Sequence, residues 1–429
     1  MFVGALTAAT SMVVAAEEAG LKAKVDALVQ PLMESGIPVG FVVGIIDHGQ
    51  RYIFGYGKLS RDADKTPDGR SIFEIGSVTK VFTGLLLADM VERKLLKLDD
   101  PVREFLPQTV TVPRWDGQVI TLLDLATQTS GLPRMPGNFS IAAVKDPRNP
   151  YANYTVEQLY EFLSHHSLSQ KPGTQFEYSN LGVGLLGHAL GRRADTSYES
   201  LVVEGICAPL GMKDTCITLS EEQRSRLAQG HGPLGRPVAN WDIRTFAGAG
   251  ALRSTVNDML KFITANLGLK KSRLSAAIEL SHLPRHDTDR PGGKIALCWH
   301  IRSDKTILWH NGQTGGYHSM LALQKQRKIG VVVLSNTAHR IVDELAMAVM
   351  AILSGEPAKP LNVDLPEGQR RGGTGAQNEG GWAATPSGLS QAVCGRFFFP
   401  HQTTFISHPM VVCHCPRWLA KACILDESD

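Results

Sequence analysis

Short segments in which hydrophobic and polar residues alternate lie near both ends of the chain, and this alternation is typical of β-strands. Residues 38–46 and 51–56 form one pair, and the turn Asp47-His48-Gly49-Gln50 between them predicts a β-hairpin. Further strands are predicted at residues 295–302, 306–309, 317–324 and 328–335. The pattern therefore predicts an antiparallel sheet built from both ends of the chain.

Elsewhere, apolar residues recur every three or four positions, as on one face of an α-helix. Residues 18–36 and 341–353 are predicted to form amphipathic helices on the sheet, and residues 81–267 a mostly helical region with long loops. We therefore expect an α+β fold, in which helices flank the sheet and the helical region is inserted. Catalytic groups from both parts are expected to meet at the seam, where pockets commonly form.

A serine and a lysine stand three residues apart where the apolar segment 81–88 begins. On a helix, Ser77 and Lys80 would share one face, so the lysine amine would reach the serine hydroxyl. A serine becomes a nucleophile when a neighbouring base takes its proton, and a helix N-terminus favours an oxyanion. The alternative is a capping serine followed by a solvated lysine. Ser77 to Lys80 is the only Ser-x-x-Lys in the chain.

A second candidate pair, Tyr178 and Asn180, follows a Pro-Gly turn and opens the apolar segment 181–190. A nearby ammonium group would lower the pKa of the Tyr178 phenol towards a useful range. The Asn180 amide offers a donor and an acceptor to a substrate. The alternative is a buried tyrosine beside a helix cap.

A third candidate segment, residues 309–317, holds His310 and the glycines Gly312, Gly315 and Gly316 between two strand-like runs. Glycine weakens a strand unless another backbone or a ligand must approach closely. The segment therefore predicts a substrate lying against a strand edge. On its own, His310 would be interpreted as an ordinary strand histidine.

Together these segments resemble the motifs of the penicillin-recognising serine hydrolases, most closely the class C β-lactamase family with its DD-peptidase, D-aminopeptidase and carboxylesterase relatives. The motifs are Ser-x-x-Lys at Ser77 and Lys80, Tyr-x-Asn at Tyr178 and Asn180, and Lys/His-x-Gly at His310 to Gly312. Segments 96–102, 122–133 and 248–259 also match, and the resemblance covers residues 25–355. It implies a serine β-lactamase/DD-peptidase-like fold.

The resemblance also implies roles for single residues. Ser77 would be the acylated nucleophile, with Lys80 and Tyr178 sharing the proton transfer; which of the two takes the serine proton stays open, because coupled groups titrate as a unit. The oxyanion hole would be the backbone N–H groups of Ser77 and Gln313, the residue after Gly312.

Substrate-binding roles follow in the same way, with two departures from the family pattern. Asn180 would bind the acyl side-chain amide, and His310 the leaving group or the substrate carboxylate. Most class C β-lactamases have lysine in place of His310, so carboxylate recognition is expected to be weaker or pH-dependent. Met135 stands where those enzymes carry an amide-reading glutamine.

Composition agrees with a soluble enzyme, and the resemblance implies a small-molecule substrate. The 429 residues include 44 basic and 41 acidic ones, a net charge of +3 without a basic block, which gives no electrostatic case for nucleic acid. The catalytic region shows no metal motif and no phosphate-binding glycine loop, so no cofactor and no metal are expected. The chain also lacks a Gly-x-Ser-x-Gly elbow, which argues against the α/β-hydrolase fold.

The N-terminal residues indicate a possible signal peptide. Residues 1–16 resemble the apolar core and cleavage site of a signal peptide but lack the basic start, and the alternative is an ordinary N-terminal helix. Export would make the protein periplasmic or secreted; otherwise it is cytoplasmic. The segment is too short for a transmembrane span, and no later segment is long enough. Residues 17–355 are assigned to the hydrolase domain.

Residues 356–429 are interpreted as a glycine-rich linker and a tail of unknown role. This part holds four of the seven cysteines, Cys394, Cys413, Cys415 and Cys423. Their spacing fits no standard zinc motif, so unpaired cysteines are expected rather than a metal site.

Three functions are compatible with the sequence. The first is hydrolysis of β-lactams through a Ser77 acyl-enzyme. The second is a carboxylesterase or D-amino-acid peptidase with the same machinery, which His310 and Met135 favour. The third is a penicillin-binding sensor or scaffold that is acylated and turns over little.

Overall fold

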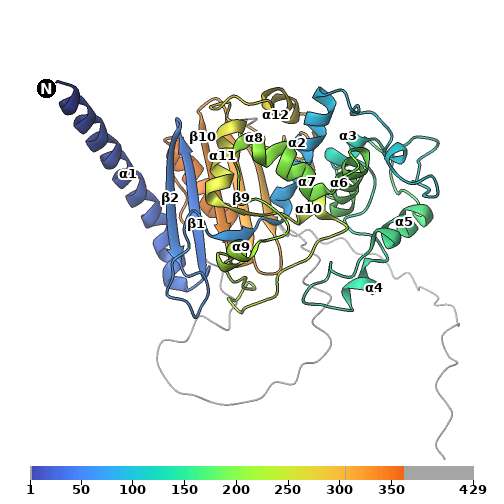
Figure 1. The fold of residues 1–429 in the computed structure, drawn as a ribbon, viewed down its shortest axis with the longest axis horizontal. Helices are drawn as coiled ribbons and strands as arrows, with labels where there is room; N and C mark the ends of the chain where they lie inside the picture. Colours follow the sequence, from blue (N-terminus) through green and yellow to red (C-terminus); the bar gives the residue numbers. More distant parts are fainter. Residues whose placement is uncertain (1, 305, 362–429) are drawn as a thin grey trace, which may run out of the picture. The chain divides into compact units, whose positions relative to one another are not determined.

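An eight-stranded antiparallel sheet joins the two ends of the described chain in the order β2-β1-β10-β9-β8-β7-β6-β5 (Figure 1). The structure is a computed structural model that describes residues 2–304 and 306–361, with side chains from residue 15 onward. Its strands are β1 (Gly40–Asp47), β2 (Gln50–Gly57), β5 (His286–Asp287), β6 (Lys294–Ile295), β7 (His300–Ile301), β8 (Leu308–Gln313), β9 (His318–Gln324) and β10 (Ile329–Ser335). Pairing of β1 with β10 confirms the predicted sheet from both chain ends.

The predicted N-terminal hairpin is confirmed as β1 and β2. The chain reverses at His48 and Gly49, whose φ values are 49° and 95°. Two successive residues with positive φ fit the twist of a two-residue hairpin turn, and glycine accepts this conformation without strain.

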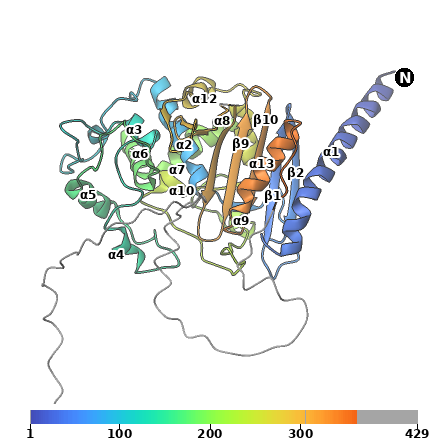
Figure 2. The same cartoon turned by 180° about the vertical axis from the view of Figure 1, so that it is seen from behind.

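Helices α1 (Phe2–Ser35) and α13 (Ile341–Leu353) cover one face of the sheet (Figure 2). Val25, Val29 and Leu32 of α1 recur every three or four positions, and all three are buried in the cluster that α1 and α13 form with the sheet. The helix predicted at 341–353 is confirmed residue for residue. The helix predicted at 18–36 is part of a longer one that begins at Phe2.

The opposite face carries the predicted helical region, which is confirmed. A second sheet pairs β3 (Ile72–Glu74) with β4 (Arg253–Thr255). The helical elements are η1 (Gly76–Val78), α2 (Thr79–Glu92), η2 (Val102–Phe105), α3 (Leu122–Ala126), α4 (Phe139–Ala143), α5 (Val156–His165), α6 (Asn180–Arg193), α7 (Tyr198–Val202), η3 (Val203–Cys207), α8 (Ala208–Leu210), α9 (Glu221–Ser225), α10 (Ala247–Gly250), α11 (Val256–Asn266) and α12 (Ser275–Ser281).

Helix α2 lies inside this region and is buried around most of its circumference. Residues 79–90 are all buried, and Phe82 stacks on Phe262 of α11 with ring centroids 4.3 Å apart. A helix that is enclosed on all sides is part of the core rather than of the surface. Its first turn therefore places Lys80 in the interior, and the partly exposed Ser77 lies in the turn η1 directly before it.

Two predicted strands have different bounds in the structure. The segment predicted as one strand at 295–302 is split into β6 and β7, because Cys298 has a φ of 62° and the N–H of Ala296 donates to the Trp299 carbonyl in a tight turn. The motif expected between two strands lies within β8. His310 and Gly312 continue the ladder, opposite Leu321 and Ser319 of β9.

Some expectations about the chain ends stay predictions. Within residues 2–304 and 306–361, no helix has the length and apolarity needed to cross a membrane. The described cysteines, Cys207, Cys216 and Cys298, are all free thiols. The tail cysteines lie outside the described residues. The boundaries at residues 16 and 355 stay predictions.

Candidate active site

Ser77 lies in the turn η1, which packs directly against β8. Gly76 has a φ of +48°, and a Cβ added there would stand 2.7 Å from the backbone nitrogen of Gln313. A Cβ on Gly312 would stand 2.1 Å from the Ile75 carbonyl oxygen. Because a side chain fits at neither position, glycine is required at both. This close approach brings the backbone of Ser77 beside that of Gln313.

Lys80 is fully buried and lies next to Ser77. Its Nζ is 2.9 Å from Ser77 Oγ, 2.8 Å from Asn180 Oδ1 and 2.6 Å from the Ala249 carbonyl oxygen. Burial holds the pKa of the Lys80 amine well below its usual range, and the charge of Arg134 lowers the pKa further. A neutral amine has two hydrogens for the two carbonyl oxygens and a lone pair for the Ser77 hydroxyl. The geometry therefore suits Lys80 as a base.

Tyr178 is hydrogen-bonded to Ser77, and its ring lies 5.0 Å from Lys80 Nζ and 5.1 Å from the guanidinium carbon of Arg134. We predicted that a neighbouring ammonium would lower the pKa of this phenol. That prediction is wrong, because burial raises the pKa of Tyr178 to about 12, and the Ser77 bond and Arg134 offset this only in part. The Lys80 amine is itself driven towards neutrality. Tyr178 therefore keeps its proton and suits the role of proton donor.

Asn180 is the first residue of α6. Ser179 caps this helix, since its Oγ accepts a hydrogen bond from the Gly182 N–H at 2.8 Å. The Asn180 Oδ1 accepts a hydrogen bond from Lys80 Nζ at 2.8 Å. The amide expected to bind the substrate therefore has a protein partner, and it orients the lysine.

His310 is buried in β8, with 1% of its surface exposed. Its Nδ1 lies 2.6 Å from the Asn311 carbonyl oxygen, so the proton is assigned to Nδ1. Its Nε2 is buried and has no hydrogen-bond partner within the described part of the chain. Burial, with His300 and Lys80 nearby, holds the pKa of His310 well below its usual range. Of the two alternatives expected for carboxylate recognition by His310, pH dependence near neutrality is therefore wrong, and weaker recognition stays a prediction.

Strand β8 loses its pairing with β7 at His310. Strand β7 pairs with β8 at two positions, His300 with Trp309 and Ile301 with Leu308. Residues 310–313 extend past the end of that pairing. An exposed strand edge can pair with an extended ligand, so a substrate can lie along this segment, next to Ser77.

A small pocket opens onto Ser77, with a volume of about 20 Å³. Its lining comes from Gly76, Ser77, Tyr151, Asn180, Trp241, Ile243, Phe246, Ala249, Gly250 and Gln313. Sequence reasoning missed Tyr151 and Trp241, which stand in loops without a motif. It also gave no role to Ala249 and Arg134, although both lie in or next to segments that match the family.

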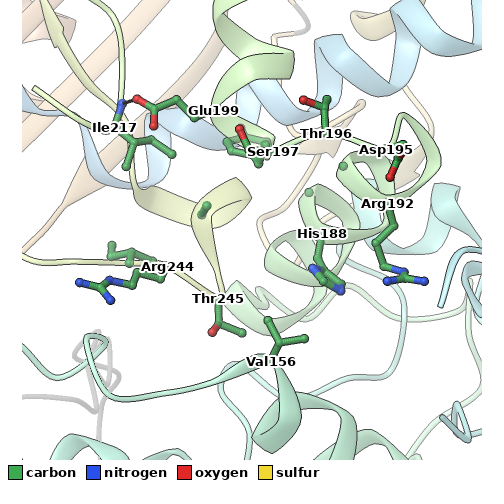
Figure 3. Close-up of a pocket in the computed structure, with 15 residues that line it drawn as sticks. Val156, His188, Arg192, Asp195, Thr196, Ser197, Glu199, Ile217, Arg244 and Thr245 are labelled. Carbon is green, nitrogen blue, oxygen red and sulfur yellow. Dashed lines mark hydrogen bonds between the residues drawn. The ribbon is translucent and has the colours of Figure 1, made fainter. Parts of the chain in front are cut away.

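A larger cavity of about 590 Å³ is shown in Figure 3, and Ile243 lines both this cavity and the small pocket. Several of its polar groups are bound to protein partners. The Glu199 carboxylate accepts from the backbone N–H groups of Ile217 and Thr218, at 2.7 and 2.6 Å. His188 Nε2 lies 2.6 Å from the Tyr160 hydroxyl. Of the catalytic candidates, Ser77 lines the smaller pocket, and Lys80 lies next to Ser77.

Comparison with known proteins gives matches over most of the chain. A family model described as Beta-lactamase matches residues 25–354. A β-lactamase of Pseudomonas fluorescens is 28% identical over 365 residues, which are 77% of this chain and 97% of that protein. The D-alanyl-D-alanine-carboxypeptidase/endopeptidase AmpH of Escherichia coli (strain K12) is 30% identical over 314 residues, 69% of this chain and 78% of that protein.

Solved structures agree with these matches. The β-lactamase/D-alanine carboxypeptidase of Yersinia pestis, in complex with citrate, has a TM-score of 0.68 at 26% identity, covering 78% of this chain and 98% of that chain. The matches confirm the resemblance and the α+β fold predicted from the sequence.

Proposed function

The chain belongs to the β-lactamase family of serine hydrolases, and we propose that it cleaves its substrate through an acyl-enzyme on Ser77. The observation that carries this proposal is the buried Lys80 amine, 2.9 Å from the Ser77 hydroxyl. A desolvated amine with a lowered pKa is the kind of base that activates a serine. We also propose the roles of Lys80, Tyr178 and Asn180 in the two steps of this reaction.

In the first step, Lys80 Nζ takes the proton of Ser77 as its Oγ bonds to the substrate carbonyl carbon. The backbone N–H groups of Ser77 and Gln313 stabilise the oxyanion. The bond between the carbonyl carbon and the leaving group then breaks. Tyr178 passes a proton to the leaving atom and regains one from the Lys80 ammonium, so charge and protons balance.

In the second step, water hydrolyses the ester on Ser77. The water loses a proton to the Lys80–Tyr178 pair, its oxygen bonds to the acyl carbon, and the bond from that carbon to Ser77 Oγ breaks. Ser77 regains its proton from the pair, and the carboxylic acid leaves. Asn180 keeps Lys80 in place through the bond between its Oδ1 and the lysine Nζ at 2.8 Å.

For the substrate, we give first place to the β-lactam amide. The relative that matches over 97% of its own length is a β-lactamase, and acylation of Ser77 would open the strained ring. An ester or a D-amino-acid peptide is the second candidate, and His310 favours it. With its proton on Nδ1, the ring keeps a lone pair at the buried Nε2. This lone pair would accept from an N–H or O–H of a leaving group that reaches it, and would repel a carboxylate.

Export is proposed on the apolar N-terminal segment alone, with residues 17–355 as the mature catalytic domain. The mass of the protein purified from its host would show cleavage near residue 16 if this is right. An uncleaved N-terminus would contradict it.

Hydrolysis of nitrocefin and p-nitrophenyl acetate, each with wild type and Ser77→Ala, tests the proposed function. Serine-dependent opening of nitrocefin supports a β-lactamase. Serine-dependent ester cleavage with little nitrocefin opening transfers the assignment to the second candidate. Stable acylation with slow turnover of both would identify a penicillin-binding sensor. Equal activity in Ser77→Ala would overturn the acyl-enzyme itself.

A further inference from the structure

The small pocket at Ser77 lies on the acyl side of the scissile bond. Asn180 and Gln313 line it, whereas His310, which we assign to the leaving group, does not. A volume of about 20 Å³ is close to the room that one water molecule needs. An acyl group larger than a methyl group therefore fills this space and meets the residues of the wall.

Two loops meet to form the outer part of this wall. Tyr151 packs on Trp241 with ring centroids 5.3 Å apart. Beside them, Asn149 Nδ2 donates to Asp242 Oδ2 at 2.9 Å, and the N–H of Asp242 donates to Asn149 Oδ1 at 2.8 Å. We call Asn149, Tyr151, Trp241 and Asp242 the clasp.

One half of the clasp is fixed to the core of the site. The N–H of Trp241 donates to Glu74 Oε1 at 3.1 Å, and Glu74 is paired with Arg253 at 3.2 Å. The Trp241 indole sits on the turn after β8, where a Cβ on Gly315 would stand 2.7 Å from Trp241 Nε1. Because Trp241 is held at both its backbone and its ring, it resists displacement.

The other half of the clasp lies near the catalytic groups. Tyr151 lines the pocket together with Asn180, and the Asn180 side chain in turn holds Lys80. The Tyr151 ring packs on Phe139 with centroids 5.0 Å apart, and its hydroxyl is 3.9 Å from Met135 Sδ, the residue that replaces the family glutamine. A bulky acyl group would have to move Tyr151, which shares the pocket wall with the residue that holds Lys80.

We propose that the clasp selects substrates with small acyl groups, which for esters means acetyl-sized groups and for β-lactams a ring without a bulky acylamino side chain. This inference rests on the proposed acylation of Ser77. Trp241 and Tyr151 act as specificity-determining residues by occupying the space that larger acyl groups need. The Asn149–Asp242 bonds hold the two loops together.

The test is the ratio of kcat/KM for p-nitrophenyl acetate to that for p-nitrophenyl hexanoate, in wild type, Trp241→Ala and Asn149→Ala. We expect wild type to favour acetate by at least about 10-fold, and Trp241→Ala to lower the ratio by about 10-fold or more, on the scale of one methylene group in a tight pocket. Asn149→Ala should lower it about threefold, as expected for weakening one pair of hydrogen bonds. 6-Aminopenicillanic acid and benzylpenicillin, which differ in the acylamino side chain, should follow the same order.

The matched control is Trp115→Ala, because Trp115 is 38% exposed and lies outside the pocket lining. Its ratio should equal that of wild type. Trp241→Phe, which keeps a ring in place, should give an intermediate ratio and guards against misfolding of the alanine variant. Serine-dependent activity with no acyl preference in wild type, or an unchanged ratio in both Trp241 variants, would overturn the clasp and leave the proposed function intact. Ester and β-lactam cleavage that persists in Ser77→Ala would overturn both.

Discussion

The pocket at Ser77 and the cavity in Figure 3 differ in size by a factor of about thirty, and the smaller one holds the candidate chemistry. At Ser77, the serine hydroxyl and the Asn180 amide oxygen both lie within 2.9 Å of Lys80 Nζ. In the cavity, Arg192 and Arg244 lie at opposite sides (Figure 3), and Glu199 and His188 are bound to other protein groups. Volume alone is therefore a poor guide to the active site.

The difference in chemistry between the two spaces originates in how burial shifts the pKa values of the groups around Ser77. The pKa of Lys80 is held well below its usual range by burial, and that of Tyr178 is raised to about 12 by burial, so both groups favour their neutral forms. A neutral amine beside a protonated phenol forms a base and acid pair. The cavity lining also holds two groups with shifted pKa values. Burial lowers the pKa of His188 to about 4, but its Nε2 is occupied by the Tyr160 hydroxyl. Burial raises the pKa of Tyr198, whose hydroxyl is bonded to Thr83 Oγ1 at 2.7 Å.

Replacing the nucleophile should have the largest effect. Ser77→Ala is expected to abolish hydrolysis of every substrate that wild type cleaves, because no acyl-enzyme can form. Steady-state rates with nitrocefin and p-nitrophenyl acetate measure this, with Ser225→Ala as the control, since Ser225 is exposed on α9. Residual turnover near the wild-type rate would place the nucleophile elsewhere.

Removing the base or the proton donor should come next. Lys80→Ala and Tyr178→Phe are each expected to slow acylation by at least about 10²-fold, the usual scale of general acid–base catalysis. Stopped-flow acylation rates give the measurement, and the exposed Lys213→Ala is the matched control for Lys80. A near-normal rate in either variant would remove that residue from its proposed role.

The pH profile should show one rising limb. Below the lowered pKa of Lys80 the amine is protonated and cannot act as a base, so kcat/KM rises as pH increases through that value. Tyr178, with a pKa of about 12, stays protonated, so no falling limb is expected below pH about 11. His310 stays neutral, and His310→Gln should leave the shape between pH 6 and 8 unchanged. A bell-shaped profile centred below pH 8 would contradict these assignments.

A change in the larger cavity should matter least. Arg244→Ala removes an exposed side chain from the cavity wall, and kcat/KM should stay within about twofold of wild type, as for ordinary surface substitutions. A loss of more than about tenfold on the same substrates would show that the cavity takes part in catalysis, and the comparison between the two spaces would fail.

The sequence predicted the parts of the fold and site that depend on local pattern. The hairpin at residues 40–57, the helix at 341–353 and the three motifs follow from residue spacing. The split of the 295–302 segment did not follow, because the positive φ of Cys298 is imposed by its surroundings rather than by a glycine or proline.

The pKa shifts of the site could not be predicted from the sequence, because they depend on how deeply each group is buried. The fall in the pKa of Tyr178 was inferred from the charge of a neighbouring lysine, but the enclosure of α2 favours neutrality of both groups. The clasp residues Tyr151 and Trp241 meet only in the folded chain, at 5.3 Å between ring centroids, and neither belongs to a motif.

Mapping the acylated residue tests the central claim most directly. Wild type and Ser77→Ala would each be treated with a fluorophosphonate and with benzylpenicillin, and the adducts located by peptide mass spectrometry. The account predicts a single adduct on Ser77 in wild type and no adduct in Ser77→Ala. An adduct on another residue, or equal labelling of both proteins, would contradict it.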